Sequence, residues 1–169
     1  PHTGALIGML VPSGSAEIVS PGEMLLTTDG RLLVASIGTA RVFEFDAETG
    51  ALLGVLADFS LAGVGSPVGL VESPSGTIVV STTGNRVLEL DPDIGAILRT
   101  IVPQGSGGLL SPRGVLFLPD STLLVASYGS GSLLRYDATT GRFLGRWDLG
   151  GPPGSAWGLA RPWSLRLDA

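Results

Sequence analysis

Short apolar runs separated by turn-forming residues follow one another along the chain, and the pattern is clearest in residues 111–147. The apolar runs of this stretch are 113–118, 123–127, 133–136 and 142–147. Pro119 and Asp120 stand in the first gap, a Gly/Ser segment in the second, and Asp137 with Gly141 in the third. Runs of four to six residues are too short for helices, so the pattern predicts strands joined as hairpins.

The same pattern recurs upstream with a period of about 45 residues. Pro21, Pro67 and Pro112 open three copies and are 46 and 45 residues apart. Each copy also carries an aspartate with a glycine four residues later, namely Asp46 and Gly50, Asp91 and Gly95, and Asp137 and Gly141. Four strands in such a period predict the blade of a β-propeller, in which twisted four-stranded sheets stack face to face around an axis.

This alignment divides a single all-β domain into five segments. The three full antiparallel blades are predicted at 20–65, 66–110 and 111–160. Residues 1–19 match the outer strand of a preceding blade, with 5–11 aligned to 51–56, and residues 161–169 match the inner strand of a following one. In a four-bladed ring these terminal strands could belong to the same blade, but its two middle strands would be missing. Exposed blade faces and edges are unfavourable in soluble proteins. We therefore expect a larger propeller of six to eight blades, completed by a longer chain or by another subunit.

The repeat resembles the NHL-type propeller repeats of bacterial proteins over nearly the whole chain. The resemblance rests on the spacing of the opening Pro and Gly, the LLVAS-like second run, and the Asp-x-x-x-Gly turn. It does not extend to WD repeats, because the combined G-H…W-D signature is absent and the tryptophans do not recur at the repeat period. The resemblance implies a secreted or periplasmic protein. It is specific for architecture and weak for function, since this fold carries both enzymes and binding surfaces.

Composition excludes several functional classes. The net charge is −5, and all ten basic residues are arginine, which argues against binding to nucleic acid or anionic membranes. There is no cysteine, so disulfides, thiol nucleophiles and thiolate metal sites are excluded. No apolar run approaches about eighteen residues, which argues against membrane insertion.

The most informative surface for function is the face formed by the loops between second and third strands and by the connectors between blades. Most of these segments are Gly, Ser and small apolar residues, so the charged and aromatic exceptions stand out as ligand-binding candidates. The candidates are Glu23, Asn85, Arg86, Arg113, Tyr128, Arg161 and Trp163. The alternative role for Trp163, and for Trp157, is to cover a joint between blades.

The carboxylates and the single histidine have simpler explanations than catalysis. Asp46, Asp91 and Asp137 lie on separate blades, so we expect them to cap turns rather than to share a metal ion. His2 stands at a turn position near a terminus and has no nucleophile or base near it in sequence. Glu23 is aligned with Gly69, Gly114 and Ser164 on the innermost strands, where a side chain can point into the channel.

These residues predict a non-catalytic propeller scaffold, without a cofactor, that binds a protein, peptide or glycan. The alternative is a metal-dependent hydrolase or lactonase, or a lyase, with its site completed by absent blades and a divalent cation such as Ca²⁺ in the central channel. Propeller hydrolases hold their metal with Glu, Asn and Asp from several blades, and Glu23 is the residue that would contribute here. A third reading makes the chain one part of a large assembly.

Overall fold

The computed structural model describes residues 8–12, 14, 16–147 and 161–166, and it consists of three four-stranded antiparallel sheets. Blade 1 contains β1 (Pro21–Leu26), β2 (Arg31–Ser36), β3 (Arg41–Asp46) and β4 (Leu52–Asp58). Blade 2 contains β5 (Pro67–Glu72), β6 (Ile78–Thr82), β7 (Arg86–Leu90) and β8 (Ile97–Val102). Blade 3 contains β9 (Pro112–Phe117), β10 (Thr122–Ser127), β11 (Ser132–Asp137) and β12 (Phe143–Arg146). Two 3₁₀ turns, η1 (Ser106–Gly108) and η2 (Tyr128–Ser130), lie in the loops. The predicted fold class is confirmed, and the strand bounds agree to within a few residues.

The repeated aspartates cap the turns between the third and fourth strands, as predicted. Asp46 Oδ1 accepts hydrogen bonds from the backbone N–H of Thr49 at 2.7 Å and from the Thr49 hydroxyl. Asp137 makes the same two bonds with Thr140, and Asp91 accepts two backbone N–H groups of its own turn. These hydrogen bonds, the threonine hydroxyl first, lower the pKa of Asp46 and Asp137. Each aspartate is therefore satisfied within its own turn.

The core lies between the blades rather than within them. Leu33 and Val42 of blade 1 face Val80 and Leu88 of blade 2, and all four are fully buried. A second cluster joins blades 2 and 3 in the same way around Tyr136, whose hydroxyl donates to the Ser106 carbonyl at 2.8 Å. The second run of blade 2 is apolar at almost every position because its two faces contact two different blades, Ile78 and Val80 on one side and Val79 on the other.

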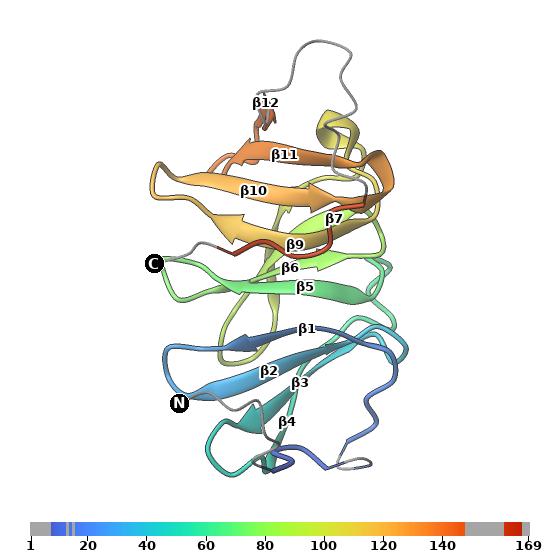
Figure 1. Ribbon diagram of the computed structural model, residues 1–169, viewed down its shortest axis with the longest axis vertical. Coiled ribbons are helices and arrows are strands. Elements are labelled where there is room, and N and C mark those ends of the chain that lie inside the picture. The colour runs from blue at the N-terminus through green and yellow to red at the C-terminus, as the bar shows by residue number, and fades with distance from the viewer. Residues whose placement is uncertain (1–7, 13, 15, 148–160, 167–169) are drawn as a thin grey trace.

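The inner strands β1, β5 and β9 lie side by side at the hub (Figure 1). Glycines permit this close approach. A Cβ on Gly22 would lie 2.6 Å from the Val68 carbonyl oxygen, and one on Gly69 would collide with the Arg113 carbonyl. The Ser81 hydroxyl reinforces the second contact, because it accepts the Gly69 N–H and donates to the Arg113 carbonyl.

The two terminal segments occupy blade positions without forming the predicted strands. Within the predicted strand at 5–11, the described residues 8–11 form no ladder, and the rest lies outside the described residues. The Leu10 carbonyl nevertheless lies against Gly50 as the Leu56 carbonyl lies against Gly95 in the next blade. Leu10 and Leu56 are aligned in the repeat, so this segment stands where an outer strand would.

Residues 161–166 likewise form no strand, but they follow the inner edge of blade 3. The Gly114 N–H donates to the Trp163 carbonyl at 2.8 Å. Leu165 packs on the outward face of this blade, against Leu124, Ala126 and Leu133. The segment therefore stands beside β9 as β9 stands beside β5.

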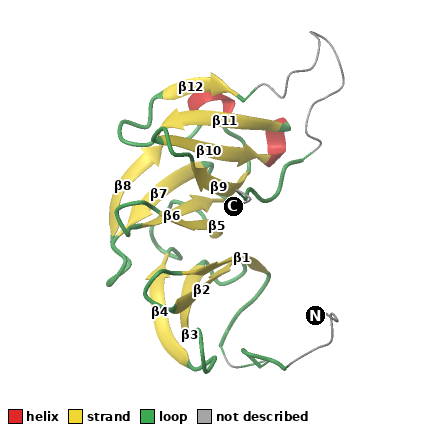
Figure 2. Cartoon of the chain, turned by 60° about the vertical axis from the view of Figure 1, so that its left-hand side comes forward, coloured by secondary structure: helices red, strands yellow, loops and turns green. Residues whose placement is uncertain are grey.

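The inner segments close a tighter ring than the expected six to eight blades would form. The Ser164 hydroxyl donates to Glu23 Oε1 of β1 at 3.3 Å, so residues 161–166 contact the first inner strand as well as the last. Four inner segments thus surround one axis. In Figure 2 blade 1 points down, blade 2 to the left and blade 3 up, and no described strand occupies the remaining side.

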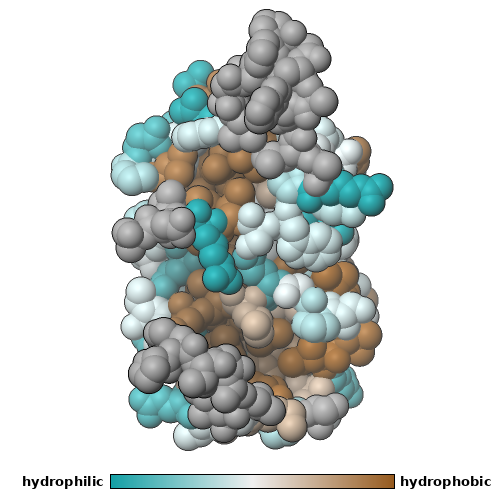
Figure 3. Space-filling model, in the orientation of Figure 1, coloured by the Kyte–Doolittle hydropathy of each residue, from teal (hydrophilic) through white to brown (hydrophobic). Residues whose placement is uncertain are grey.

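That remaining side exposes apolar surface. Met24 and Leu26 of β1 are 66% and 65% exposed, although the equivalent residues of β5 and β9 are buried or half-buried. Figure 3 shows hydrophobic surface over blades 1 and 3 on this side. The outward face of blade 1 is nevertheless covered around Phe43 and Phe45, by Val11 and by residues 16–18.

Candidate functional site

Four of the seven predicted site residues meet at one mouth of the channel, on the face formed by the loops and connectors. Arg113 comes from β9, Tyr128 from η2, and Arg161 and Trp163 from the last described segment. We call Arg113, Tyr128, Arg161 and Trp163 the arginine–aromatic cluster. Residues 161–166 follow the inner edge of blade 3, so the three contributing segments lie side by side and the cluster spans the joint between them.

Both arginines of the cluster lie against aromatic rings. The Arg113 guanidinium carbon is 4.6 Å from the centroid of the Trp163 ring and 5.3 Å from that of Tyr128. The Arg161 guanidinium lies 5.5 Å from the Tyr128 centroid, and its Nη1 is 3.4 Å from the Tyr128 hydroxyl. Tyr128 and Trp163 meet edge to face with centroids 5.7 Å apart. Cation–π contacts of this kind hold a guanidinium plane without consuming its N–H donors.

The loop beneath the cluster is held by a buried hydroxyl. Ser127 Oγ accepts the Leu110 N–H at 3.0 Å and donates to the Leu110 carbonyl at 3.1 Å. The Tyr128 N–H then donates to the Ser111 carbonyl. Ser36 holds the connector before blade 1 in the same way. The position of Tyr128 is therefore set by a repeated structural element of the blade.

Glu23 lies next to the cluster, inside the channel. Its carboxylate accepts hydrogen bonds from the Leu70 N–H at 3.2 Å and from the Ser164 hydroxyl. Burial raises the pKa of Glu23 above its ordinary value of 4.5, although these two bonds and the nearby charge of Arg166 oppose the increase. Glu23 therefore faces the channel, as the alignment with Gly69 and Gly114 predicts.

Asn85 and Arg86 make no contact with the cluster. The Asn85 side chain accepts the Ser111 N–H at 2.6 Å, and Asn85 itself has a φ of 58°, so it shapes a turn and holds the connector. Arg86 donates to the Gly84 carbonyl at 3.4 Å. Trp163 is 53% exposed and lies at the joint between blade 3 and residues 161–166, whereas His2 and Trp157 lie outside the described residues.

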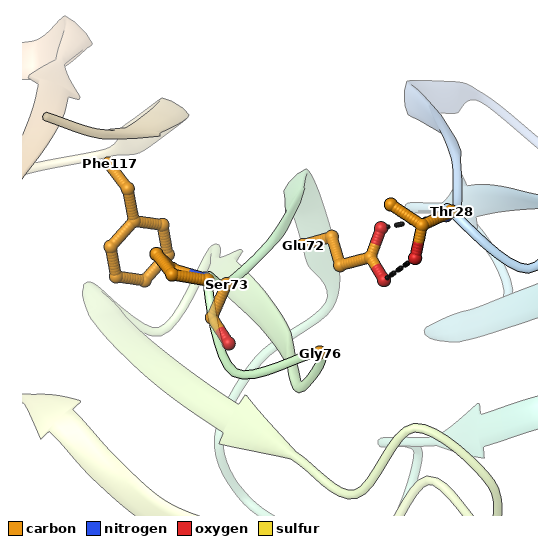
Figure 4. Close-up of a pocket in the computed structure, with 6 residues that line it drawn as sticks. Thr28, Glu72, Ser73, Gly76 and Phe117 are labelled. Atoms are coloured by element: carbon orange, nitrogen blue, oxygen red, sulfur yellow. Dashed lines mark hydrogen bonds between the residues drawn. The ribbon is translucent and has the colours of Figure 1, made fainter. Parts of the chain in front are cut away.

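The opposite mouth of the channel carries hollows that the sequence analysis missed. One has a volume of about 400 Å³ and is lined by Thr28, Glu72, Ser73, Pro74, Gly76 and Phe117. Figure 4 shows Glu72 turned toward Thr28, whose N–H and hydroxyl both donate to it at 2.8 Å, with Phe117 across the hollow. Glu72 and Phe117 occupy the same repeat position, at the ends of two inner strands. This alignment is the sequence signal that could have placed both residues at the opposite mouth. The Glu72 carboxylate is already satisfied by blade 1.

A neighbouring hollow of about 510 Å³ is lined by residues of blades 2 and 3, including Glu89 and Arg99. These two side chains form an ion pair, and Arg99 also donates to the Thr139 and Ala138 carbonyls. The pair therefore joins the blades and has few free donors for a ligand.

The described residues hold no group of three metal-ligating side chains of the His, Cys, Asp or Glu type. In the channel, Glu23 supplies one carboxylate and Ser164 one hydroxyl, whereas a Ca²⁺ ion takes six to eight oxygens. These residues therefore do not fit a divalent cation by themselves. Within the described ranges no helix has the length and hydrophobicity needed to cross a membrane.

No protein-family model matches the chain, and no curated protein matches its sequence. Solved structures do match it. A streptogramin B lyase shares 14% identity, with a TM-score of 0.62 over 84% of this chain and 44% of that chain. The WD40 β-propeller domain of Doa1 shares 14% identity, with a TM-score of 0.61 over 78% of this chain and 41% of that chain. The computationally designed Ika4 protein shares 13% identity, with a TM-score of 0.64 over 97% of this chain and 89% of that chain.

The chain thus spans less than half of the length of the lyase and of the WD40 domain, and nearly the whole length of the designed protein. At these identities the matches establish architecture alone. Together with the three antiparallel sheets, they show that this chain has an all-β, β-propeller fold.

Proposed function

We propose that the chain is a non-catalytic scaffold that binds a protein, peptide or glycan partner at the arginine–aromatic cluster. The observation that supports this proposal is the meeting of two stacked arginines with Tyr128 and the exposed Trp163 at one channel mouth. Arginine, tyrosine and tryptophan are the residues most enriched at binding hot spots. The WD40 domain of similar fold favours the same kind of role.

The remaining parts of the proposal follow from the sequence. The repeat supports a bacterial NHL-type protein, and that resemblance supports a secreted or periplasmic location. The net charge of −5 favours partners other than nucleic acid. Further blades, from a longer chain or another subunit, would cover the apolar surface around Met24 and Leu26.

The test is capture of partners on arrays of peptides and glycans by the wild type and by a Trp163→Ala variant. Trp163 is half-exposed, so its truncation leaves the blades intact. We expect captured partners to be lost or weakened at least about tenfold, as hot-spot truncation predicts. Leu61→Ala is the matched control, because Leu61 is almost fully exposed on another connector. Equal binding by Trp163→Ala and the wild type would place the site elsewhere.

A second candidate function is a hydrolase or lyase whose site is completed by blades absent from this chain. Glu23 favours it, since a half-buried carboxyl with a raised pKa inside a channel suits acid–base chemistry. The test is turnover of lactones and esters with Ca²⁺ or with a chelator, in the wild type and in Glu23→Gln. Turnover that depends on both Ca²⁺ and Glu23 would replace the scaffold proposal.

A further inference from the structure

Charge is distributed unevenly between the two faces of the propeller. The turns between first and second strands, and between third and fourth, all lie on one face, which we call the turn face. Its acidic residues are Asp29, Asp46, Glu48, Asp91, Asp93, Asp120 and Asp137, and they outnumber its arginines, of which Arg31 pairs with Asp29 and Arg135 with Asp120. The opposite face, the loop face, carries the cluster. Among its described acidic residues, Glu17 and Asp58 are both paired with Arg41.

The arginines of the cluster, by contrast, have no acidic partner in the described part of the chain. No described carboxylate lies within 4.0 Å of the Arg113 or Arg161 guanidinium. Arg113 Nε is buried and has no hydrogen-bond acceptor there. An arriving ligand therefore meets the terminal nitrogens of Arg113 rather than Nε. Because the ring contacts do not consume guanidinium N–H donors, both arginines favour an arriving acceptor of negative charge at this mouth. Apart from the half-buried Glu23 inside the channel, the described charges at this mouth are those of the two arginines, in a protein whose net charge is −5.

Apolar surface adjoins these charges. Leu110 is 48% exposed and lies against the loop of Tyr128, because a Cβ on Gly129 would touch the Leu110 side chain. Trp163 offers its exposed ring beside Arg113. A peptide can place an apolar side chain next to a carboxylate, whereas a glycan offers few groups that would bury Leu110. The combination therefore favours a peptide.

Resting on the function proposed above, we propose that the arginine–aromatic cluster recognises an acidic peptide segment with apolar side chains between its carboxylates. Arg113 and Arg161 take the carboxylates through charge-assisted hydrogen bonds. Trp163 and Leu110 take the neighbouring apolar side chains. The acidic turn face repels the same peptide, so binding is confined to the loop face.

The probes are two fluorescein-labelled octapeptides, one alternating Glu and Leu and one alternating Gln and Leu. Fluorescence polarisation measures their binding at about 20 and 150 mM NaCl. At low salt we expect the Glu peptide to bind at least about tenfold more tightly than the Gln peptide. At high salt we expect this difference in affinity between the two peptides to be smaller. Arg161→Gln, at an exposed position, should weaken the Glu peptide about tenfold, and Arg113→Gln at least as much. Arg142→Gln, an exposed arginine of the turn face, is the matched control and should change nothing.

The outcomes separate this inference from the proposal beneath it. If both peptides bound equally and Trp163→Ala abolished that binding, the preference for an acidic peptide would be overturned, but the mouth would still be a binding site. Binding of a galacturonate hexamer but of neither peptide would overturn the peptide and leave a glycan scaffold. An equal loss in Arg142→Gln would show that only net charge matters, and binding of none of the three probes would also overturn the inference.

Discussion

The hub between blades 2 and 3 depends on one hydroxyl, that of Ser81, and its removal tests how the ring is held. Ser81 is fully buried, accepts the Gly69 N–H at 2.9 Å and donates to the Arg113 carbonyl at 2.6 Å. In Ser81→Ala both backbone groups lose this partner and remain buried. A buried polar group left unsatisfied costs about 1–3 kcal/mol, so we expect a loss of roughly 2–4 kcal/mol in the free energy of unfolding. For a domain of this size that loss lowers Tm by about 5–12 °C.

Urea denaturation followed by tryptophan fluorescence measures the loss, with calorimetry as a second probe. The matched control is Ser75→Ala, which removes a hydroxyl–hydroxyl bond at an exposed turn and should cost less than about 0.5 kcal/mol. If Ser81→Ala were no more destabilising than Ser75→Ala, the inner strands would be held by packing alone. The argument from the buried hydroxyl would then be wrong.

Three further predictions follow from other contacts. Tyr136→Phe removes the donor to the half-buried Ser106 carbonyl and should cost about 1–2 kcal/mol in denaturant melts. Gly69→Ala should cost more than Gly54→Ala, because a Cβ on Gly69 meets backbone and one on Gly54 meets open space; thermal melts of both variants would expose an error if they ranked equally. Burial raises the pKa of Glu23, so protonation of its carboxyl favours the folded state. The stabilisation of the fold by this protonation is complete below the unfolded pKa of about 4.5 and is lost as the pH rises through the folded pKa. Glu23→Gln should therefore lose less stability than the wild type as the pH rises above about 4.5, and parallel stability curves would contradict this.

Local sequence signals predicted the blades because each one acts within a few residues. Asp46 with Gly50 and Asp137 with Gly141 define turns through bonds that close inside the turn. The meeting of Arg113 and Tyr128 was also predictable, since alternate strand ends return to the same face of every blade. The contact of Asn85 was not predictable, because its side-chain oxygen accepts the N–H of Ser111, 26 residues away, and no local pattern reveals that partner.

The curvature of the ring was not predictable from the repeat. The angle between blades depends on how closely inner strands approach, as where Gly22 faces the Val68 carbonyl. The sequence shows a glycine at such a position but not the backbone that it will face. The bond from Ser164 to Glu23, across 141 residues of chain, depends on that accumulated curvature and on the geometry of every blade between them.

The separation of charge between the two faces gives the molecule an electric dipole along its ring axis. A net charge of −5 suggests simple repulsion from any anionic surface. The dipole instead orients the molecule, so that an anionic surface meets the loop face first, within the Debye length of about 10 Å at 0.1 M salt.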